Sequence, residues 1–268
     1  MKSFLTIILI LFINNACFAQ KTNNLYDFSK NKNNSFELNE ELYYKFSYGK
    51  SNKKGVLTGG YGSLKVMGTL KKDSLIAYKV EAQGKTTNLF SLFYHVEDFF
   101  ASYIDTSSLL THQFTRSVKE GPYEKNQTAY FERGAKNTII AEGKRMGITN
   151  YTQDVLSALY ACRTIPNEEI VINDTIFIQI YNLEKKEMFD TYFVPIKKEK
   201  IKTKIFGEIN TIKCHPHVKK NRIFSEKDET YIWVTDDQYH LPVKVETPIQ
   251  VGSIYIEIID AKNINYKF

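Results

Sequence analysis

Cysteine and proline are scarce in this chain of 268 residues, which contains 3 Cys and 6 Pro. So few cysteines exclude a small fold held together mainly by disulfides. The 13 Gly fall far short of the one third that a collagen-like repeat requires. Charged residues make up 25% of the chain against 43% hydrophobic residues, which excludes an intrinsically disordered protein. We therefore expect a globular protein with a sizeable core.

A concentrated positive charge and a long apolar segment are also missing beyond the N-terminus. The chain has 36 Lys and Arg against 30 Asp and Glu, a net charge of +6. Its densest basic runs, residues 197–200 and 218–222, are short and are typical of a solvated surface rather than of nucleic-acid binding. No segment after residue 19 approaches the length of about 20 apolar residues that a membrane-spanning helix needs. We expect no nucleic-acid partner, while peripheral contact with a membrane stays open.

Residues 1–19 have the pattern of a secretory signal peptide. Lys2 supplies the positive start, residues 4–13 are apolar, and Cys17 and Ala19 are small residues at the positions that signal peptidase inspects. We expect the mature protein to begin at Gln20 and to be exported, either periplasmic or associated with the outer envelope. A competing interpretation makes Cys17 a lipidated N-terminus, because Ala16-Cys17 has the ending of a lipoprotein signal.

Two cysteines, Cys162 and Cys214, remain after removal of the leader. An exported protein is exposed to an oxidising compartment, so a disulfide between them is compatible with the sequence. Both also have apolar neighbours in the sequence, and a free cysteine in such surroundings behaves as a small buried hydrophobe. The sequence does not decide between the two states.

Aromatic residues and period-two alternation are abundant. The chain has 18 Tyr and 18 Phe, which favour strands, and Leu42, Tyr44, Phe46 and Tyr48 fall on one face of a predicted strand. Similar patterns predict strands over residues 62–69, 75–83, 111–119, 128–133, 138–142, 170–181, 188–195, 203–214, 230–235, 242–246 and 253–260.

Helical patterns are confined to two short stretches, residues 89–94 and 153–163, the second with Thr152 as a candidate N-cap. The fold prediction is therefore mainly β: a large curved antiparallel sheet or barrel-like fold with one or two short helices. We expect a single domain over residues 37–268, preceded over residues 20–36 by a flexible arm rich in Asn and Lys.

Four segments resemble an exported bacterial family known as domain of unknown function 3108. They are residues 41–49 (ELYYKFSYG), 94–105 (YHVEDFFASYID), 154–163 (DVLSALYACR) and 232–243 (IWVTDDQYHLPV). Thr235 and His240 depart from the pattern, which has Ser and a basic residue there. The resemblance extends from about Glu37 to Asp260. It implies an exported, mainly antiparallel β protein, similar in general shape to periplasmic lipoprotein carriers that shelter acyl chains, and it implies no catalytic residue.

The sequence Cys214-His215-Pro216-His217 contains side chains of the types that bind zinc. Alternation along a strand directs Cys214 away from His215, and no second Cys/His pair lies nearby in the sequence. A strand end with two exposed histidines is the expected structure. We predict neither a metal site nor a cofactor.

Candidate catalytic groups also have structural interpretations. The acids Asp98, Asp105, Asp154 and Asp237 are of the type that cleaves glycosidic bonds, but they equally suit turns and helix caps. Ser102 and Ser157 lack the flanking glycines of a nucleophile elbow. We expect a protein that is not an enzyme, with an envelope hydrolase as the third possibility.

The aromatic side chains either fill the concave face of the sheet or line it. If they line it, the protein binds or carries a lipid-like apolar ligand, and the predicted mouth of the groove consists of Leu89, Phe90, Leu92, Phe93, Phe99 and Phe100. If they fill it, the protein is a structural or scaffolding component of the envelope that acts through protein contacts. A continuous apolar cavity of roughly several hundred Å3 favours the first hypothesis, and a packed interior favours the second.

Overall fold

The computed structural model describes residues 24–49, 57–72, 75–217, 229–249 and 252–265. The predicted signal peptide, residues 1–19, and the lipidation alternative at Cys17 lie outside the described residues. The described part forms a 15-stranded sheet. Its strands are β1 (Glu41–Gly49), β2 (Leu57–Lys72), β3 (Leu75–Thr86), β4 (Val96–Asp105), β5 (Thr111–Glu120), β6 (Tyr123–Glu132), β7 (Thr138–Ala141), β8 (Lys144–Gly147), β9 (Thr152–Gln153), β10 (Ile176–Asn182), β11 (Glu187–Thr203), β12 (Gly207–Pro216), β13 (Tyr231–Thr235), β14 (Pro242–Pro248) and β15 (Ser253–Lys262).

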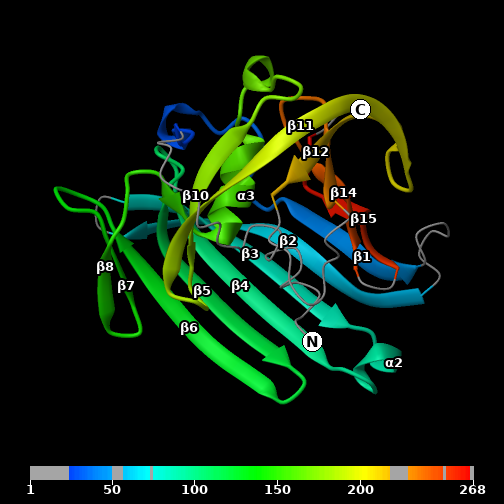
Figure 1. Ribbon diagram of the computed structural model, residues 1–268, viewed down its shortest axis with the longest axis horizontal. Coiled ribbons are helices and arrows are strands. Elements are labelled where there is room, and N and C mark those ends of the chain that lie inside the picture. The colour runs from blue at the N-terminus through cyan, green and yellow to red at the C-terminus, as the bar shows by residue number, and fades with distance from the viewer. Residues whose placement is uncertain (1–23, 50–56, 73–74, 218–228, 250–251, 266–268) are drawn as a thin grey trace.

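The strands follow one another around the sheet almost in chain order. Strands β8 to β1 run from one edge to the middle, where β1 pairs with β15, and β15 to β9 continue to the other edge. All neighbours are antiparallel except β9 and β10. The sheet bends into a barrel-like form without closing (Figure 1). The predicted fold class, a large curved antiparallel sheet with short helices, is therefore confirmed.

The helices are short. They are α2 (Asn88–Ser91), α3 (Val155–Arg163) and two 3-10 turns, Phe28–Lys30 and Asn167–Glu169. Helix α3 lies in the hollow of the curved sheet, where it contacts β3, β4 and β10 (Figure 1). No helix within the described ranges is long and apolar enough to span a bilayer.

Alternation along the strands produces the core. In β1, Leu42, Tyr44 and Phe46 point inward and are buried, as the period-two pattern predicts. They join one continuous cluster of buried apolar side chains that includes Leu156 and Tyr160 of α3. The helix thus fills the concave side of the sheet with apolar side chains.

The start of α3 differs from the prediction. Thr152 is not its N-cap, because this residue belongs to β9. Asp154 caps the helix instead: its carboxylate accepts hydrogen bonds from the backbone N–H of Leu156 at 2.7 Å and of Ser157 at 3.0 Å. A carboxylate satisfies two otherwise unpaired amides and also suits the positive end of the helix dipole.

The prediction of a flexible arm over residues 20–36 is wrong for residues 24–36. Leu25 forms a parallel bridge with Phe177, and the side chains of Phe28 and Phe36 are buried in the core. The ring of Phe36 meets that of Tyr160 edge to face, with centroids 5.0 Å apart. These few apolar anchors in a polar stretch are enough to dock it. Residues 20–23 lie outside the described part.

Several element boundaries also differ from the sequence predictions. Strand β10 begins at Ile176 rather than Ile170, because Asn173 has a positive φ of 68° and Asp174 N–H bonds to the carbonyl of Val171 in a turn. Strands β4, β8 and β9 had no predicted counterpart. The helix expected at residues 89–94 is shorter, a single turn over Asn88–Ser91.

Gly62 of β2 lies against Phe46 of β1, so a substitution at Gly62 tests the close packing of these two strands. A methyl group placed on it would come within 2.6 Å of Phe46 Cζ and 2.8 Å of the carbonyl oxygen of Gln83. We expect Gly62→Ala to lower the free energy of unfolding by about 1–3 kcal/mol, the usual cost of overpacking a core. Gly134→Ala is the control, because that position is open. Urea unfolding of the two variants checks this, and equal stability would contradict it.

Candidate functional site

A fully buried polar network holds the N-terminus of α3. Asp154 Oδ2 accepts hydrogen bonds from the hydroxyls of Ser102 on β4, at 2.6 Å, and Thr111 on β5, at 2.8 Å. Gln153 Nε2 donates to the carbonyl of Leu109 at 2.9 Å. Burial raises the pKa of Asp154, against the effect of its hydrogen bonds. The network anchors the helix to the sheet.

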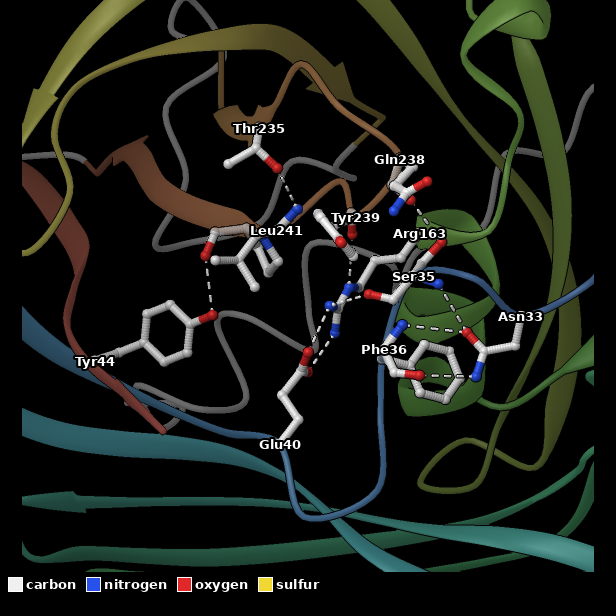
Figure 2. Close-up of polar contacts among 11 residues, drawn as sticks. Asn33, Ser35, Phe36, Glu40, Tyr44, Arg163, Thr235, Gln238, Tyr239 and Leu241 are labelled. Carbon is white, nitrogen blue, oxygen red and sulfur yellow. Dashed lines mark hydrogen bonds and ion pairs between the residues drawn. The ribbon is translucent and has the colours of Figure 1, made fainter. Parts of the chain in front are cut away.

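A second polar cluster holds the C-terminus of α3 (Figure 2). Arg163 forms a two-pronged ion pair with Glu40, with Nη1–Oε1 and Nη2–Oε2 distances of 2.6 and 2.9 Å. Arg163 also donates to the carbonyls of Ser35 at 2.7 Å and Tyr239 at 3.1 Å. The side chains of Arg163 and Glu40 are 3% and 1% exposed. The cluster connects three segments that are far apart in the sequence.

Further contacts extend this cluster into the turn between β13 and β14. The hydroxyl of Tyr44 donates to the carbonyl of Pro242 at 2.9 Å, and Leu241 N–H donates to Thr235 Oγ1 at 2.9 Å (Figure 2). His240 lies 3.0 Å from the carbonyl oxygen of Ile165 through Nε2. Burial lowers the pKa of His240, against the effect of its contacts with the carbonyls of Thr235 and Ile165.

The four segments that suggested a family resemblance meet at these two clusters. Residues 41–49 contribute Tyr44, residues 94–105 contribute Ser102, residues 154–163 contribute the whole of α3, and residues 232–243 contribute the β13–β14 turn. Each of these contacts secures α3 or a neighbouring strand. The four segments therefore contribute to the architecture around α3.

An apolar cavity of about 70 Å3 lies between α3 and strands β11 to β14. Its walls are Leu159, Cys162, Arg163, Ile170, Phe193, Ile212, Cys214, Pro216, Ile232, Val234, His240 and Pro242. Cys162 and Cys214 face this cavity as free thiols. Burial raises the pKa of both, that of Cys214 to about 12, so both are protonated and unreactive at neutral pH.

The six residues predicted to line the mouth of a ligand groove do not meet in one pocket. Leu89, Leu92 and Phe93 are strongly exposed on and after α2, and Phe90 is half-buried beside them. Phe100 is buried in the core, stacked on Phe114 with ring centroids 6.3 Å apart. Phe99 lies on the opposite side of β4, where it lines an outer hollow with Tyr43 and Tyr61. Because these apolar residues are close together in the sequence, the prediction did not separate those on opposite faces of the strand. Ligand binding by the six residues stays a prediction.

The acidic candidates mostly hold loops. Asp105 accepts hydrogen bonds from the backbone N–H of Ser107 and Ser108 at 3.0 and 2.7 Å. Asp237 accepts from Tyr239 N–H at 2.9 Å and from the hydroxyl of Thr235 at 2.8 Å. Asp98 is buried on β4. These are the turn and strand-end roles that their sequence contexts allow.

The serine and Cys/His candidates also have structural roles. Ser102 and Ser157 are fully buried in the Asp154 network. Cys214 points into the apolar cavity, whereas His215 bonds to the carbonyl of Thr230 and His217 stacks on Tyr192. No three His, Cys, Asp or Glu side chains among the described residues are arranged to hold a metal ion.

A basic hollow of about 520 Å3 lies between the end of the β11–β12 hairpin and strands β14, β15 and β1. Its lysines are Lys45, Lys202, Lys204 and Lys244, with Glu257 as the one acidic lining residue. Lys45 lies 3.5 Å from Glu257. Lys202 and Lys204 pair with no acidic side chain of the described ranges. Lys202 and Lys204 follow the basic run at residues 197–200, which was interpreted as a solvated surface, and the sequence alone did not indicate that the hairpin brings these two lysines beside β14.

The outer face of β12 to β14, next to this hollow, carries stacked lysine and aromatic side chains. Lys213 Nζ lies 3.4 Å from the ring centroid of Tyr231, and Lys244 Nζ lies 4.1 Å from that of Trp233. Trp233 Nε1 donates to Glu199 at 2.9 Å. Burial lowers the pKa of Lys213. Each cation–π contact of this kind stabilises an exposed site by about 0.5–1 kcal/mol.

Comparison with known families agrees with this architecture. Residues 42–259 match the family described as protein of unknown function (DUF3108). The chain belongs to this family. The match covers all four segments that meet around α3, apart from Glu41 at the start of the first. No curated protein is similar enough to count as a relative.

A solved structure resembles this chain in fold. A β-barrel-like protein of the domain of unknown function DUF1849 from Brucella abortus has a TM-score of 0.55 at 10% identity, covering 85% of this chain and 98% of that one. At this identity the likeness concerns the fold alone.

Two further structures are more distant. A candidate lipoprotein from Parabacteroides distasonis has a TM-score of 0.37 at 12% identity, covering 90% of this chain and 100% of that one. A protein from Bacteroides fragilis described as having a YmcC-like fold has a TM-score of 0.38 at 9% identity, covering 85% and 98%. Neither adds an argument about this chain.

The buried Arg163–Glu40 pair is the sharpest test of the α3 anchor. We expect Arg163→Met to lower the free energy of unfolding by about 3–5 kcal/mol, because it leaves the Glu40 carboxylate buried without its cation. The double variant Arg163→Met, Glu40→Leu should recover part of this loss. Arg145→Met is the matched control, since its pair with Glu132 is exposed and should contribute about 1 kcal/mol or less. Thermal and urea unfolding measure these differences, and a loss in Arg163→Met no larger than the control would contradict the anchor.

Proposed function

We propose that the protein is a non-enzymatic scaffold of the cell envelope, exported by its leader, which uses a rigid barrel-like body to present a basic and aromatic outer surface to an acidic protein partner. The observation on which this proposal depends is the packed interior. Buried apolar side chains of the sheet and α3 form one continuous cluster. The apolar cavity beside α3 is about 70 Å3, well below the roughly 300 Å3 at which small-molecule sites begin.

The acidic partner is inferred from the charge of the hollow beneath the β11–β12 hairpin. Its lining has four lysines against one glutamate. Lys202 and Lys204 are exposed there. The adjoining Tyr231, half-buried beside Lys213, supplies rigid aromatic contact area of the kind that is enriched at the centres of protein interfaces. A basic surface with an aromatic anchor suits an acidic protein segment.

Cross-linking in intact envelopes tests the scaffold proposal. A zero-length reagent joins amines only to adjacent carboxylates, so the wild-type chain should give a discrete adduct with an acidic partner. We expect Lys202→Glu, Lys204→Glu to reduce this adduct at least fivefold, because the charge reversal repels the partner. Lys136→Glu, Lys144→Glu is the matched control, since both lysines are exposed at the β7–β8 end of the sheet. No adduct, or equal adducts from the two double variants, would refute the acidic partner.

Binding of a lipid-like ligand is the second candidate function, supported by the almost wholly apolar walls of the cavity beside α3. A space of about 70 Å3 suits the end of an acyl chain rather than a whole lipid. Leu159 and Cys162 on α3 and Cys214 on β12 face it.

A fluorescent fatty-acid titration, with mass spectrometry of material extracted from the purified protein, tests the second candidate. If the cavity accepts an acyl end, Cys214→Leu should weaken saturable binding at least tenfold, because the larger side chain fills the cavity. Ile76→Leu, on the exposed side of β3, should leave it unchanged. Absence of both copurified lipid and saturable binding would eliminate this function.

A further inference from the structure

The most exposed large apolar side chains of the described chain gather at one tip of the sheet. Leu89, Leu92 and Phe93 are 60%, 81% and 84% exposed. They lie on α2 and the residues after it, in the connection between β3 and β4. Figure 1 shows α2 projecting from the ends of these strands, away from α3. Isolated exposed apolar residues are common, but three such residues within five positions are not.

Hydrogen bonds hold this tip in a defined shape. Thr87 Oγ1 accepts from Phe90 N–H at 3.3 Å, and Thr86 Oγ1 accepts from Val96 N–H at 3.0 Å. The same Thr86 hydroxyl lies 2.8 Å from Ser91 Oγ. The connection is therefore a fixed turn between two paired strands. It presents its apolar side chains to solvent instead of folding them onto the core.

Two neighbouring segments extend the apolar tip along the rim. Thr87 N–H donates to the carbonyl of Gly59, which places the start of β2, with Leu57 43% exposed, beside α2. Gly121 N–H donates to the carbonyl of His95, which places the β5–β6 turn on the other side, with Tyr123 43% exposed. A tyrosine at the border of an apolar tip is typical of side chains at a membrane–water interface.

We propose that this rim, formed by Leu57, α2 with Leu92 and Phe93, and Tyr123, is a membrane-contact site that inserts its apolar tip into the surface of a lipid bilayer. A protein partner is a poorer fit. At roughly 200 Å2 per large side chain, the exposed fractions of Leu89, Leu92 and Phe93 together offer about 450 Å2. A standard protein interface buries about 800 Å2 on each partner.

The charges beside the tip indicate that insertion is driven by apolar burial. Lys85 of β3 faces Glu97 of β4, and Glu97 in turn faces Lys119 of β5. Among the described residues beside the tip, this mixture of signs gives no basic cluster that would require anionic lipid. The site therefore binds zwitterionic bilayers and responds weakly to salt. This contact is independent of the scaffold proposal, since none of the residues of the rim lines the lysine hollow.

Flotation with phosphatidylcholine vesicles tests the proposal. The full chain, expressed with its own leader and purified from the exported fraction, should float with the vesicles at both low and high salt. Leu92→Ser, Phe93→Ser should reduce the partition coefficient at least tenfold. Both side chains are more than four-fifths exposed, so the variant should keep the melting temperature of the wild type. Met67→Ser, Val171→Ser, which removes two exposed apolar residues elsewhere, should partition like the wild type.

A fluorescent reporter gives a second measurement that does not depend on loss of binding. In Phe93→Trp the new indole should shift its emission to the blue and be quenched by lipid brominated on the acyl chain. The native Trp233 is buried and should contribute a constant background. Equal partitioning of wild type and Leu92→Ser, Phe93→Ser, binding only to anionic vesicles, or an unchanged spectrum of Phe93→Trp would each overturn the proposal.

Discussion

The anchoring of α3 inside the curved sheet is the constraint on which the rest of the structure depends. The helix has nine residues, Val155–Arg163, too few to be stable alone in water. It is held at both ends by buried polar groups, Asp154 at the start and Arg163 at the end, and by apolar packing between them. Without the helix, the concave face of the sheet would lose its filling and its curvature would lose support.

The two polar clusters have a further effect on specificity. A buried carboxylate or guanidinium is stable only at a position where its hydrogen-bonding or charged partners are in place. Apolar packing alone would accept many rotations of the helix in the sheet. The hydrogen bonds of Asp154 to Ser102 and of Arg163 to Glu40 select one of them.

Much of the sheet could be predicted from the sequence, because alternation acts locally. Strands such as β1 and β5 have largely period-two patterns, and the prediction placed them within a few residues. Strand β4 lacked one, since Asp98 faces inward and Phe100-Ala101-Ser102 are buried in succession. The two-residue strand β9 is too short to have a pattern.

The sites were less predictable than the strands, because they depend on contacts between distant residues. Arg163 and Glu40 are 123 positions apart, and nothing in either local sequence indicates the other. The lysine hollow needs the β11–β12 hairpin to reach β14. At the predicted groove, the mistake was local: Phe99 and Phe100 were treated as one group although neighbouring strand residues point to opposite faces.

The pairing of β1 with β15 has a consequence for the order of folding. Strands β1 and β15 are the first and last along the chain, and they are neighbours at the centre of the sheet. The ladder between them therefore joins residues about two hundred positions apart, such as Tyr48 and Ile254. Loop-closure entropy makes such pairing slow, and it cannot begin before synthesis of the chain is almost complete. Until then the long edge of β1 lacks one neighbour.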